Sequence, residues 1–275
     1  MATRVSELVN PFDRNGLALL SDIQSAEWQF NFKYLEELQN EFRDKEKAFR
    51  SPEYIWPRDP LHCWSRVWEY PYVYSNIRKW IGNNPTKIAD IGSGVTFFPF
   101  AVAKLGHEVV CCDIDPVCRR DIAKAVQELS ENHVSFRLIA DTKLPFENQE
   151  LDSAYCVSVL EHVPNFSATI LEISRILKPG GLLILTIDRA FAGQGGISGE
   201  DYKSLFKTLS EHFESPYELS LRTSFSGALL SDRGPFPMHF RSWEFYLRES
   251  IKRILGRATQ TRQLLGVEGF VLRKK

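Results

Sequence analysis

Long hydrophobic runs and an excess of positive charge are both missing from this sequence. No part of its 275 residues is an apolar run of about 18 residues, the length that spans a bilayer. The N-terminus lacks the apolar core of a signal peptide. The formal net charge is −1 at pH 7, whereas duplex-binding proteins usually carry a basic excess. We therefore expect a cytoplasmic protein with no membrane span and no nucleic-acid partner; its oligomeric state stays open.

Cysteine is also sparse. The chain has five cysteines, an odd number, and no two of them have the CxxC spacing. Cys111 and Cys112 are adjacent within a predicted buried strand. These features argue against a disulfide framework and a structural zinc site, and they predict reduced thiols. Hydrophobic residues make up 43% and charged residues 25% of the chain, as in ordinary globular proteins.

The first 80 or so residues differ from the rest of the chain. Apolar residues recur every three or four positions across Ser25–Arg50, which predicts a helix. An aromatic segment, Trp56–Tyr74, follows; prolines interrupt it, so we expect no regular strand there. Gly82–Pro85 is a predicted loop. We therefore divide the chain into an N-terminal helical and aromatic cap, residues 1–80, and a core, residues 81–275.

From Lys87 onward, short apolar runs alternate with helical stretches. The predicted strands are Lys87–Ile91, Glu108–Asp113, Val134–Ala140, Ser153–Val157 and Leu182–Ile187, and the helices between them are Phe98–Leu105, Pro116–Leu129 and Phe166–Leu177. Asp115 is expected to cap the helix that begins at Pro116. Such alternation predicts the α/β class: a doubly wound, mostly parallel sheet with helices on both faces, here preceded by the helical cap.

The pattern becomes less regular after Asp188. We interpret residues 189–265 as an insertion or lid on the substrate side of the core. Within it, Asp201–His212 and Arg241–Leu255 have helical spacing, and Tyr217–Arg222 predicts a strand. Gly266–Arg273 alternates and predicts a terminal strand. Lys178–Gly181, with its proline and two glycines, is expected to turn the chain from the third core helix into the next strand.

The first predicted core strand ends in a glycine turn, Gly92–Gly94. A dinucleotide loop would have a third glycine where Phe97 stands, and bulk at that position opposes a pyrophosphate. Asp113 ends the second strand, about 20 residues after Gly92, the offset at which a carboxylate accepts hydrogen bonds from the hydroxyls of an adenosine ribose. Asp141 follows the third strand, where an acceptor suits an adenine amino group. The three strand ends thus form a candidate nucleoside site.

These segments together resemble the class I, Rossmann-like S-adenosylmethionine-dependent methyltransferases of the methyltransferase-11-like group. The resemblance covers about Lys87–Asp188 and the terminal strand. The matching segments are Ala89–Gly94, Asp113, Ala140–Phe146, Leu151–Val163 and Arg175–Thr186. The third glycine of the family's first motif is Thr96 here. The resemblance implies a seven-stranded sheet whose last strand is antiparallel, with S-adenosylmethionine as cofactor and S-adenosylhomocysteine as product.

The same resemblance implies a set of cofactor contacts in the core. These are Asp90, Gly92, Ser93, Gly94, Asp113, Ile114, Asp141, Thr142 and Cys156. Two roles stay open for Asp90: it either holds the turn by accepting backbone N–H bonds or lies near the amino group of the cofactor. Cys156 either lines the methionine portion through its backbone or is a core side chain.

Glu161 and His162 follow the fourth strand and are the catalytic candidates. A Glu-His pair at this position helps to bind a divalent metal in small-RNA 2′-O-methyltransferases and ubiquinone-pathway O-methyltransferases, which also have a glutamate three residues earlier. Here Ser158 occupies that place, so we expect no metal. The alternatives are that His162 acts as a general base, since imidazole titrates near neutrality, or that the pair is structural.

Two interpretations of the aromatic segment also stay open. It is either a hydrophobic pad that docks the N-terminal helices or a lid in which Trp68, Tyr70 and Tyr72 line the acceptor site. In the second case Arg66 is a candidate partner for the cofactor carboxylate. His239 and Arg241 in the later insertion are further candidates for contact with an acceptor.

The sequence therefore predicts a methyltransferase acting on oxygen or nitrogen of a small molecule, such as a sugar, a phenolic compound or another metabolite. The balanced charge and the aromatic cap favour this acceptor class. One alternative is an RNA or protein methyltransferase, which would have a basic groove across the strand ends. Another is a partner subunit that binds the cofactor without catalysis.

Overall fold

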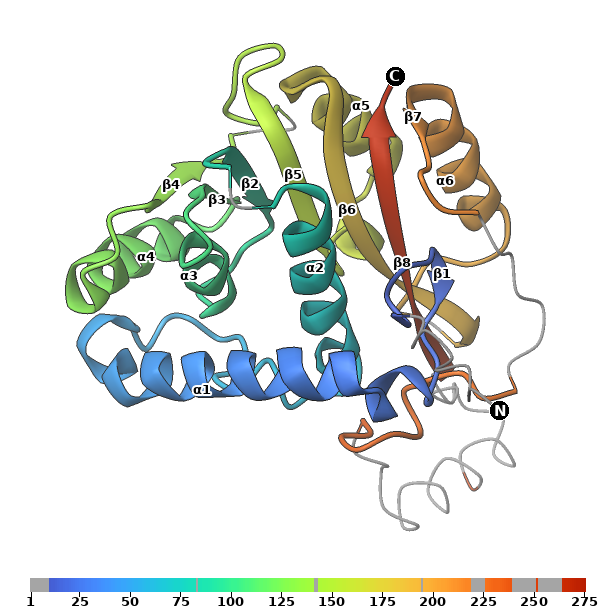
Figure 1. Ribbon diagram of the computed structural model, residues 1–275, viewed down its shortest axis with the longest axis horizontal. Coiled ribbons are helices and arrows are strands. Elements are labelled where there is room, and N and C mark those ends of the chain that lie inside the picture. The colour runs from blue at the N-terminus through green and yellow to red at the C-terminus, as the bar shows by residue number, and fades with distance from the viewer. Residues whose placement is uncertain are drawn as a thin grey trace, which may run out of the picture.

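The computed structural model describes residues 10–82, 84–140, 143–193, 195–218, 226–238, 251 and 264–275. A twisted sheet forms its middle layer, with helices on both faces (Figure 1). One face carries α2 (Arg66–Trp80), α3 (Phe98–Ala103) and α4 (Pro116–Leu129), with the long α1 (Ala26–Phe49) packed across them. The other face carries α5 (Phe166–Ile176) and α6 (Gly199–His212).

Five strands of the sheet run parallel to one another. Their order is β4 (Val134–Leu138), β3 (Glu108–Asp113), β2 (Lys87–Ile91), β5 (Leu151–Val157) and β6 (Leu177–Ala192). The last strand, β8 (Leu264–Lys274), is antiparallel to β6, and the two-residue strands β1 (Gly16–Leu17) and β7 (Phe213–Glu214) pair with β8. The predicted fold class and antiparallel last strand are confirmed. The described sheet has eight strands where seven were expected.

Several elements begin and end where the sequence predicts. The bounds of β2, β3 and α4 agree with the predicted ranges. Asp115 caps α4 as expected, because its Oδ1 accepts the N–H of Val117 at 2.8 Å. Ser25 caps α1 in the same way through the N–H of Trp28. Short polar side chains at these ends satisfy backbone groups that the first helical turn leaves unpaired.

Other elements differ from the prediction. Lys178–Gly181 is not a turn before the fifth strand as predicted. It lies within β6, at the point where the pairing with β5 shifts register. Glycine is needed at 181, because a Cβ there would lie 2.8 Å from the carbonyl oxygen of Lys178. Residues 217 and 218 of the predicted strand Tyr217–Arg222 are not in a strand, and the rest lies outside the described residues. Of the predicted helix Arg241–Leu255, the structure describes Ile251 alone, and this residue is helical.

Alternation along the parallel strands divides the core in two. Ile88, Cys111, Tyr155 and Ile184 point toward the layer of α1 to α4. Their chain neighbours, among them Ala89, Cys112, Ala154 and Leu183, point toward α5 and α6. Because side chains alternate along a strand, Thr186 and Asp188 share the face of Ile184 and therefore face α2.

The helix α2 is the main element that the sequence analysis missed. Proline in a helix interior cannot donate to the carbonyl four residues before it, and Pro71 lies in the middle of α2. The carbonyl that it leaves free belongs to Val67, and Nε1 of Trp28 in α1 donates to that oxygen at 2.8 Å. A tertiary contact thus replaces the missing helical bond, which a reading of local sequence does not detect.

The two ends of the described chain meet in the sheet. β1 pairs with the middle of β8, with Gly16 opposite Gly269. The buried side chain of Asn15 extends this pairing, because its Oδ1 accepts the N–H of Val271 at 2.8 Å. Trp68 and Tyr72 of α2 lie directly on Gly269, where any Cβ would collide with their rings. Residues 10–80 therefore share a core with the sheet, and the division at residue 80 stays a prediction.

Two findings concern the chain as a whole. None of the described helices is both long and apolar enough to cross a membrane. The five cysteines are free, and four of them are buried.

Candidate active site

The glycine turn at the end of β2 is tied to the end of β3. Gly92 and Gly94 have φ of 72° and 55°, in the left-handed region that favours glycine. The N–H groups of Gly92 and Ser93 donate to the carbonyl of Cys112 at 2.7 and 3.1 Å. A Cβ on Gly92 would overlap the side chain of Val159, which follows β5. The turn therefore sits where the carboxyl ends of β2, β3 and β5 converge, the edge at which open α/β sheets bind ligands.

Asp113 is held in place beside this turn. Its Oδ2 accepts the N–H of Gly94 at 2.9 Å and its Oδ1 accepts the N–H of Asp115 at 3.0 Å. The residue is partly exposed, and the next side chain, Ile114, is 72% exposed. A fixed, accessible carboxylate next to an exposed apolar side chain fits a ribose diol and an adenine ring. These contacts stay predictions, and Asp141 and Thr142, their predicted neighbours, lie outside the described residues.

Asp90 is buried in β2. Burial, and secondarily the negative charge of Asp113, raises the pKa of its carboxyl to about 8. Within the described residues the N–H groups of the turn donate elsewhere: Gly92 and Ser93 to Cys112, and Gly94 to Asp113. The described contacts include no bond from these N–H groups to Asp90, and its position near the amino group of the cofactor stays a prediction.

Two side chains from the segment after α1 hold the far side of the turn. The hydroxyl oxygen of Tyr54 accepts the N–H of Val95 at 2.8 Å, and Arg50 Nη2 donates to the carbonyl of Val95 at 3.0 Å. The Arg50 guanidinium lies 4.8 Å from the centre of the Tyr54 ring. Sequence reasoning missed both residues, because Tyr54 follows a proline in an irregular stretch and only the folded chain brings it to the turn.

A network of buried polar groups lies at the carboxyl ends of β5 and β6. At its centre is Glu69 of α2, which is fully buried. Its Oε1 accepts hydrogen bonds from the hydroxyls of Ser158 and Thr186, each at 2.5 Å, and its Oε2 accepts one from Arg66 Nη1 at 2.5 Å. Arg66, predicted to pair with the cofactor carboxylate, is thus paired with Glu69. The sequence analysis did not identify Glu69 or Thr186.

Glu161 and Asp188 adjoin this network. The backbone N–H of Asp188 donates to Glu161 Oε1 at 3.0 Å, while Glu161 Oε2 is buried without a hydrogen-bond partner in the described structure. Burial raises the pKa of Glu161 to about 7 and that of Asp188 well above its usual value. His162 is exposed, and its pKa is lowered by desolvation and by the positive charge of Arg66. No group of three metal-ligating side chains occurs among the described residues.

The predicted acceptor contacts on α2 are core residues in this structure. Trp68 Nε1 donates to Asp22 at 2.9 Å, and the Tyr72 hydroxyl donates to the carbonyl of Arg14 at 3.1 Å. Tyr70 stacks on Phe98 with ring centres 4.4 Å apart. This placement fits the interpretation of the segment as a hydrophobic pad, and an acceptor contact by these rings stays a prediction.

Two other predicted contacts, His239 and Arg241, lie outside the described residues. A third, Cys156, is deeply buried. Cys156 is fully buried in β5, on the face of the sheet that packs against α5 and α6. Its side chain is therefore part of the core, while a backbone contact with the cofactor stays a prediction.

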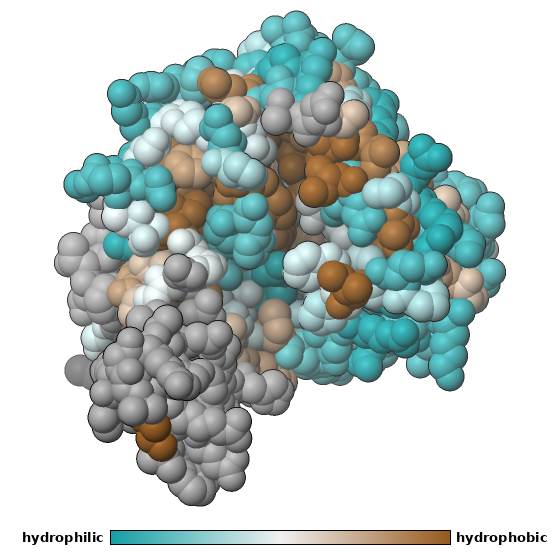
Figure 2. Space-filling model, turned by 180° about the vertical axis from the view of Figure 1, so that it is seen from behind, coloured by the Kyte–Doolittle hydropathy of each residue, from teal (hydrophilic) through white to brown (hydrophobic). Residues whose placement is uncertain are grey.

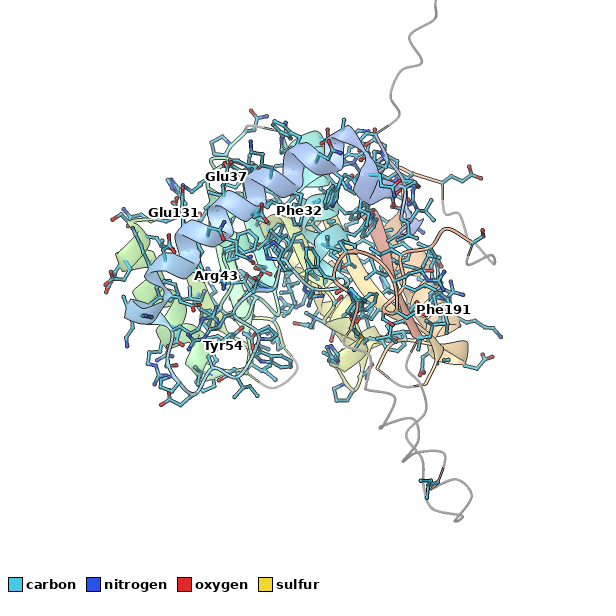
Figure 3. The ribbon with its side chains drawn as sticks, turned by 90° about the horizontal axis from the view of Figure 1, so that it is seen from below. Phe32, Glu37, Arg43, Tyr54, Glu131 and Phe191 are labelled. Carbon is cyan, nitrogen blue, oxygen red and sulfur yellow. The ribbon has the colours of Figure 1, made fainter. Side chains whose placement is uncertain are left out.

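The described surface is hollowed near its middle. Figure 2 shows this hollow on one face of the molecule, bordered by hydrophobic side chains. Seen from below, Tyr54 and Phe191 lie on opposite sides of a gap between the described side chains (Figure 3). The residues present fit S-adenosylmethionine: Asp113, beside the turn, offers acceptors for a diol, and the turn has no third glycine to accommodate a pyrophosphate.

Comparison with known sequences agrees with this geometry. Residues 89–185 match the family model of the methyltransferase domain. The ubiquinone biosynthesis O-methyltransferase of Xanthomonas campestris pv. campestris (strain B100) is 29% identical over 177 residues, which cover 61% of this chain and 72% of the relative. The enzyme of the same name from Xanthomonas axonopodis pv. citri (strain 306) is 28% identical over 183 residues, or 64% and 74% of the two chains.

Solved structures show the same fold. The [4+2]-cyclase SpnF covers 95% of this chain and 98% of its own, with a TM-score of 0.54 and 16% identity. A proposed sarcosine dimethylglycine methyltransferase from Galdieria sulphuraria covers 76% of this chain and 86% of its own, with a TM-score of 0.50 and 19% identity. Likeness at this level concerns the fold alone. Residues 89–185 therefore form a methyltransferase domain, and the fold and the ordered motifs agree with those of class I S-adenosylmethionine-dependent methyltransferases.

Proposed function

We propose that this enzyme transfers the methyl group of S-adenosylmethionine to an oxygen or nitrogen atom of a small molecule and releases S-adenosylhomocysteine. The bound cofactor supplies a methyl group already activated on a sulfonium, so the protein has to position the acceptor and remove its proton. Asp90, Gly92–Gly94, Asp113 and Ile114 would hold the cofactor. Asp141 and Thr142 are proposed contacts with its adenine.

The observation that carries this proposal is the polar network beside the glycine turn. Glu69, Glu161 and Asp188 bring three carboxyl groups to the strand ends, and an acceptor with an exchangeable proton suits such a site. The names of the Xanthomonas relatives, ubiquinone biosynthesis O-methyltransferases, favour a small acceptor with a hydroxyl group. An acidic site is a poor match for a nucleic-acid backbone.

A transfer assay with methyl-labelled S-adenosylmethionine tests the proposal. We would offer 3,4-dihydroxybenzoate as a phenolic probe, sarcosine as an amine probe, and total RNA and a protein extract as macromolecular probes. Label in either small molecule, lost in Asp113→Ala through weaker cofactor binding, is the expected result. Label confined to RNA or protein would contradict the small-molecule acceptor.

The same assay addresses the non-catalytic alternative. Calorimetry should detect binding of S-adenosylmethionine, and liquid chromatography should detect S-adenosylhomocysteine as turnover proceeds. Binding without any S-adenosylhomocysteine, across all probes, would favour a partner subunit that only binds the cofactor.

A further inference from the structure

Glu69 is a buried carboxyl group that accepts three hydrogen bonds. It is fully buried, yet two hydroxyls and one guanidinium group donate to it, from Ser158, Thr186 and Arg66. Both oxygens of Glu69 therefore act as hydrogen-bond acceptors in this network.

Ser158 links Glu69 to Asp188. Its hydroxyl donates to Glu69 Oε1 at 2.5 Å. The same hydroxyl is also the donor in a longer contact, 3.4 Å, to Asp188 Oδ1. Burial, together with the charges of Glu161 and Glu69, raises the pKa of Asp188 and so favours a protonated carboxyl.

Glu161 offers the site a buried oxygen that lacks a donor. The N–H of Asp188 fixes Oε1 of Glu161 at 3.0 Å, and Oε2 is buried without a partner in the described structure. Buried carboxylate oxygens are rarely left unpaired, because the lost hydration is costly. A hydroxyl group that enters the site would supply the missing donor.

The position of this pair relative to the glycine turn suits a role in chemistry. Val159, which lies against Gly92, is the residue between Ser158 and the short helix η2 (Leu160–His162) that carries Glu161. Ser158 has φ of 48°, a left-handed conformation that serine adopts at a cost in energy. This link places Ser158 in the polar network and Glu161 within reach of the backbone of Asp188.

We propose that Glu161, which the backbone N–H of Asp188 orients, removes the proton from a hydroxyl acceptor as the methyl group is transferred, and that Glu69 positions the pair Glu161 and Asp188. This inference rests on the proposed function and narrows its acceptor to a hydroxyl compound. In the step, the acceptor O–H bond breaks toward Glu161 Oε2 while an O–CH3 bond forms. The S–CH3 bond breaks with its electron pair staying on sulfur, which becomes a neutral thioether, and the proton later leaves to water.

The positive charge of the cofactor couples its binding to the protonation of Glu161 and Asp188. The groups around the pair are Arg66 and Glu69 from α2, Cys156 from β5, and His162 on the same short helix. A positive sulfonium nearby lowers the pKa of both carboxyls and favours loss of a proton. Once the sulfur becomes neutral, the pair binds a proton more tightly again, as a general base requires at that moment.

Proton release on cofactor binding tests the pair without any acceptor. Calorimetric titrations near pH 7, in two buffers of different ionisation enthalpy, count the protons released. We expect wild-type protein to release more protons with S-adenosylmethionine than with S-adenosylhomocysteine. Glu161→Gln and Asp188→Asn should reduce this difference, while Glu200→Gln, an exposed carboxylate on α6, should preserve it. Affinity for S-adenosylhomocysteine should change less than about threefold in each variant, which shows that the cofactor site is intact.

Methyl transfer to 3,4-dihydroxybenzoate gives the second readout. Glu161→Gln should lower kcat by about 100-fold or more, the contribution usual for a general base, and should remove the acidic limb of the pH–rate profile. Glu161→Asp retains a carboxylate and should recover part of both proton release and kcat. Equal proton release in wild type and both amide variants would overturn the proposal, as would an unchanged pH–rate profile in Glu161→Gln. If no probe is methylated, the proposed function fails while proton release still decides the role of the pair.

Discussion

Removal of one hydroxyl group at the glycine turn tests whether the N-terminal region supports the cofactor site. The Tyr54→Phe change deletes the oxygen that accepts the N–H of Val95, a fully buried residue. A buried donor left without a partner costs about 1–3 kcal/mol. For a chain of this size each kcal/mol lowers Tm by roughly 2–4 °C. If the cofactor binds only the held turn, the middle of that range, about 2 kcal/mol, weakens binding by roughly 30-fold.

Calorimetric titration of S-adenosylmethionine, together with thermal melts, would measure both effects. Tyr202→Phe is the matched control, because its hydroxyl donates to the buried Glu268 at 2.6 Å, far along the chain from the turn. We expect both variants to lose thermal stability and only Tyr54→Phe to lose cofactor affinity. Equal Kd values for Tyr54→Phe and wild type, at a lowered Tm, would refute the reasoning and leave Tyr54 a role in folding alone.

Three further predictions concern the turn, the helix α2 and pH. Gly92→Ala should weaken S-adenosylmethionine binding by more than tenfold in calorimetry, because φ is 72° and the new Cβ overlaps Val159; unchanged affinity would contradict this. Trp28→Phe should lower the free energy of unfolding by about 1–3 kcal/mol in urea, because the carbonyl that Pro71 frees loses its donor; Trp56→Phe, an exposed tryptophan, is the control. The pKa of Asp90 is raised to about 8, so the neutral form is favoured on folding, and the resulting stability is present in acid and declines as pH rises toward 8. Denaturant titrations across this range should show a shallower decline in Asp90→Asn, and an identical slope would show that Asp90 titrates normally.

The sequence predicts the strands and helices of the core well because local signals define them. An apolar run gives β3 its bounds, and Asp115 followed by Pro116 marks the start of α4. The helix α2 could not be found in this way, since the donor that permits Pro71 comes from Trp28, on another helix. The lysine-proline-glycine segment before the fifth strand has turn composition, yet tertiary pairing keeps it in β6.

The residues of the candidate site differ in the same way: some carry a local sequence signal and others do not. Gly92, Gly94 and Asp113 follow strands at characteristic spacing, and the structure brings them together. Glu69 on α2 lies far along the chain from Thr186 and Asp188 on β6, so only the folded molecule reveals their network. A helix residue such as Glu69, between Trp68 and Tyr70 in sequence, looks like an ordinary charged position until the strand ends are placed opposite it.

The pairing of Asn15 and β1 with β8 has a consequence for synthesis of the chain. Ribosomes deliver the N-terminal residues first, and early segments generally fold before the rest has emerged. Here the partner of Asn15 and β1 is β8, about 250 residues further along the chain. The aromatic surface of Trp68 and Tyr72, which rests on Gly269, lacks this cover until that strand has been made. The nascent protein therefore cannot close this part of its core before β8 emerges, and a chain that stops short of β8 leaves the surface open to aggregation and to chaperones.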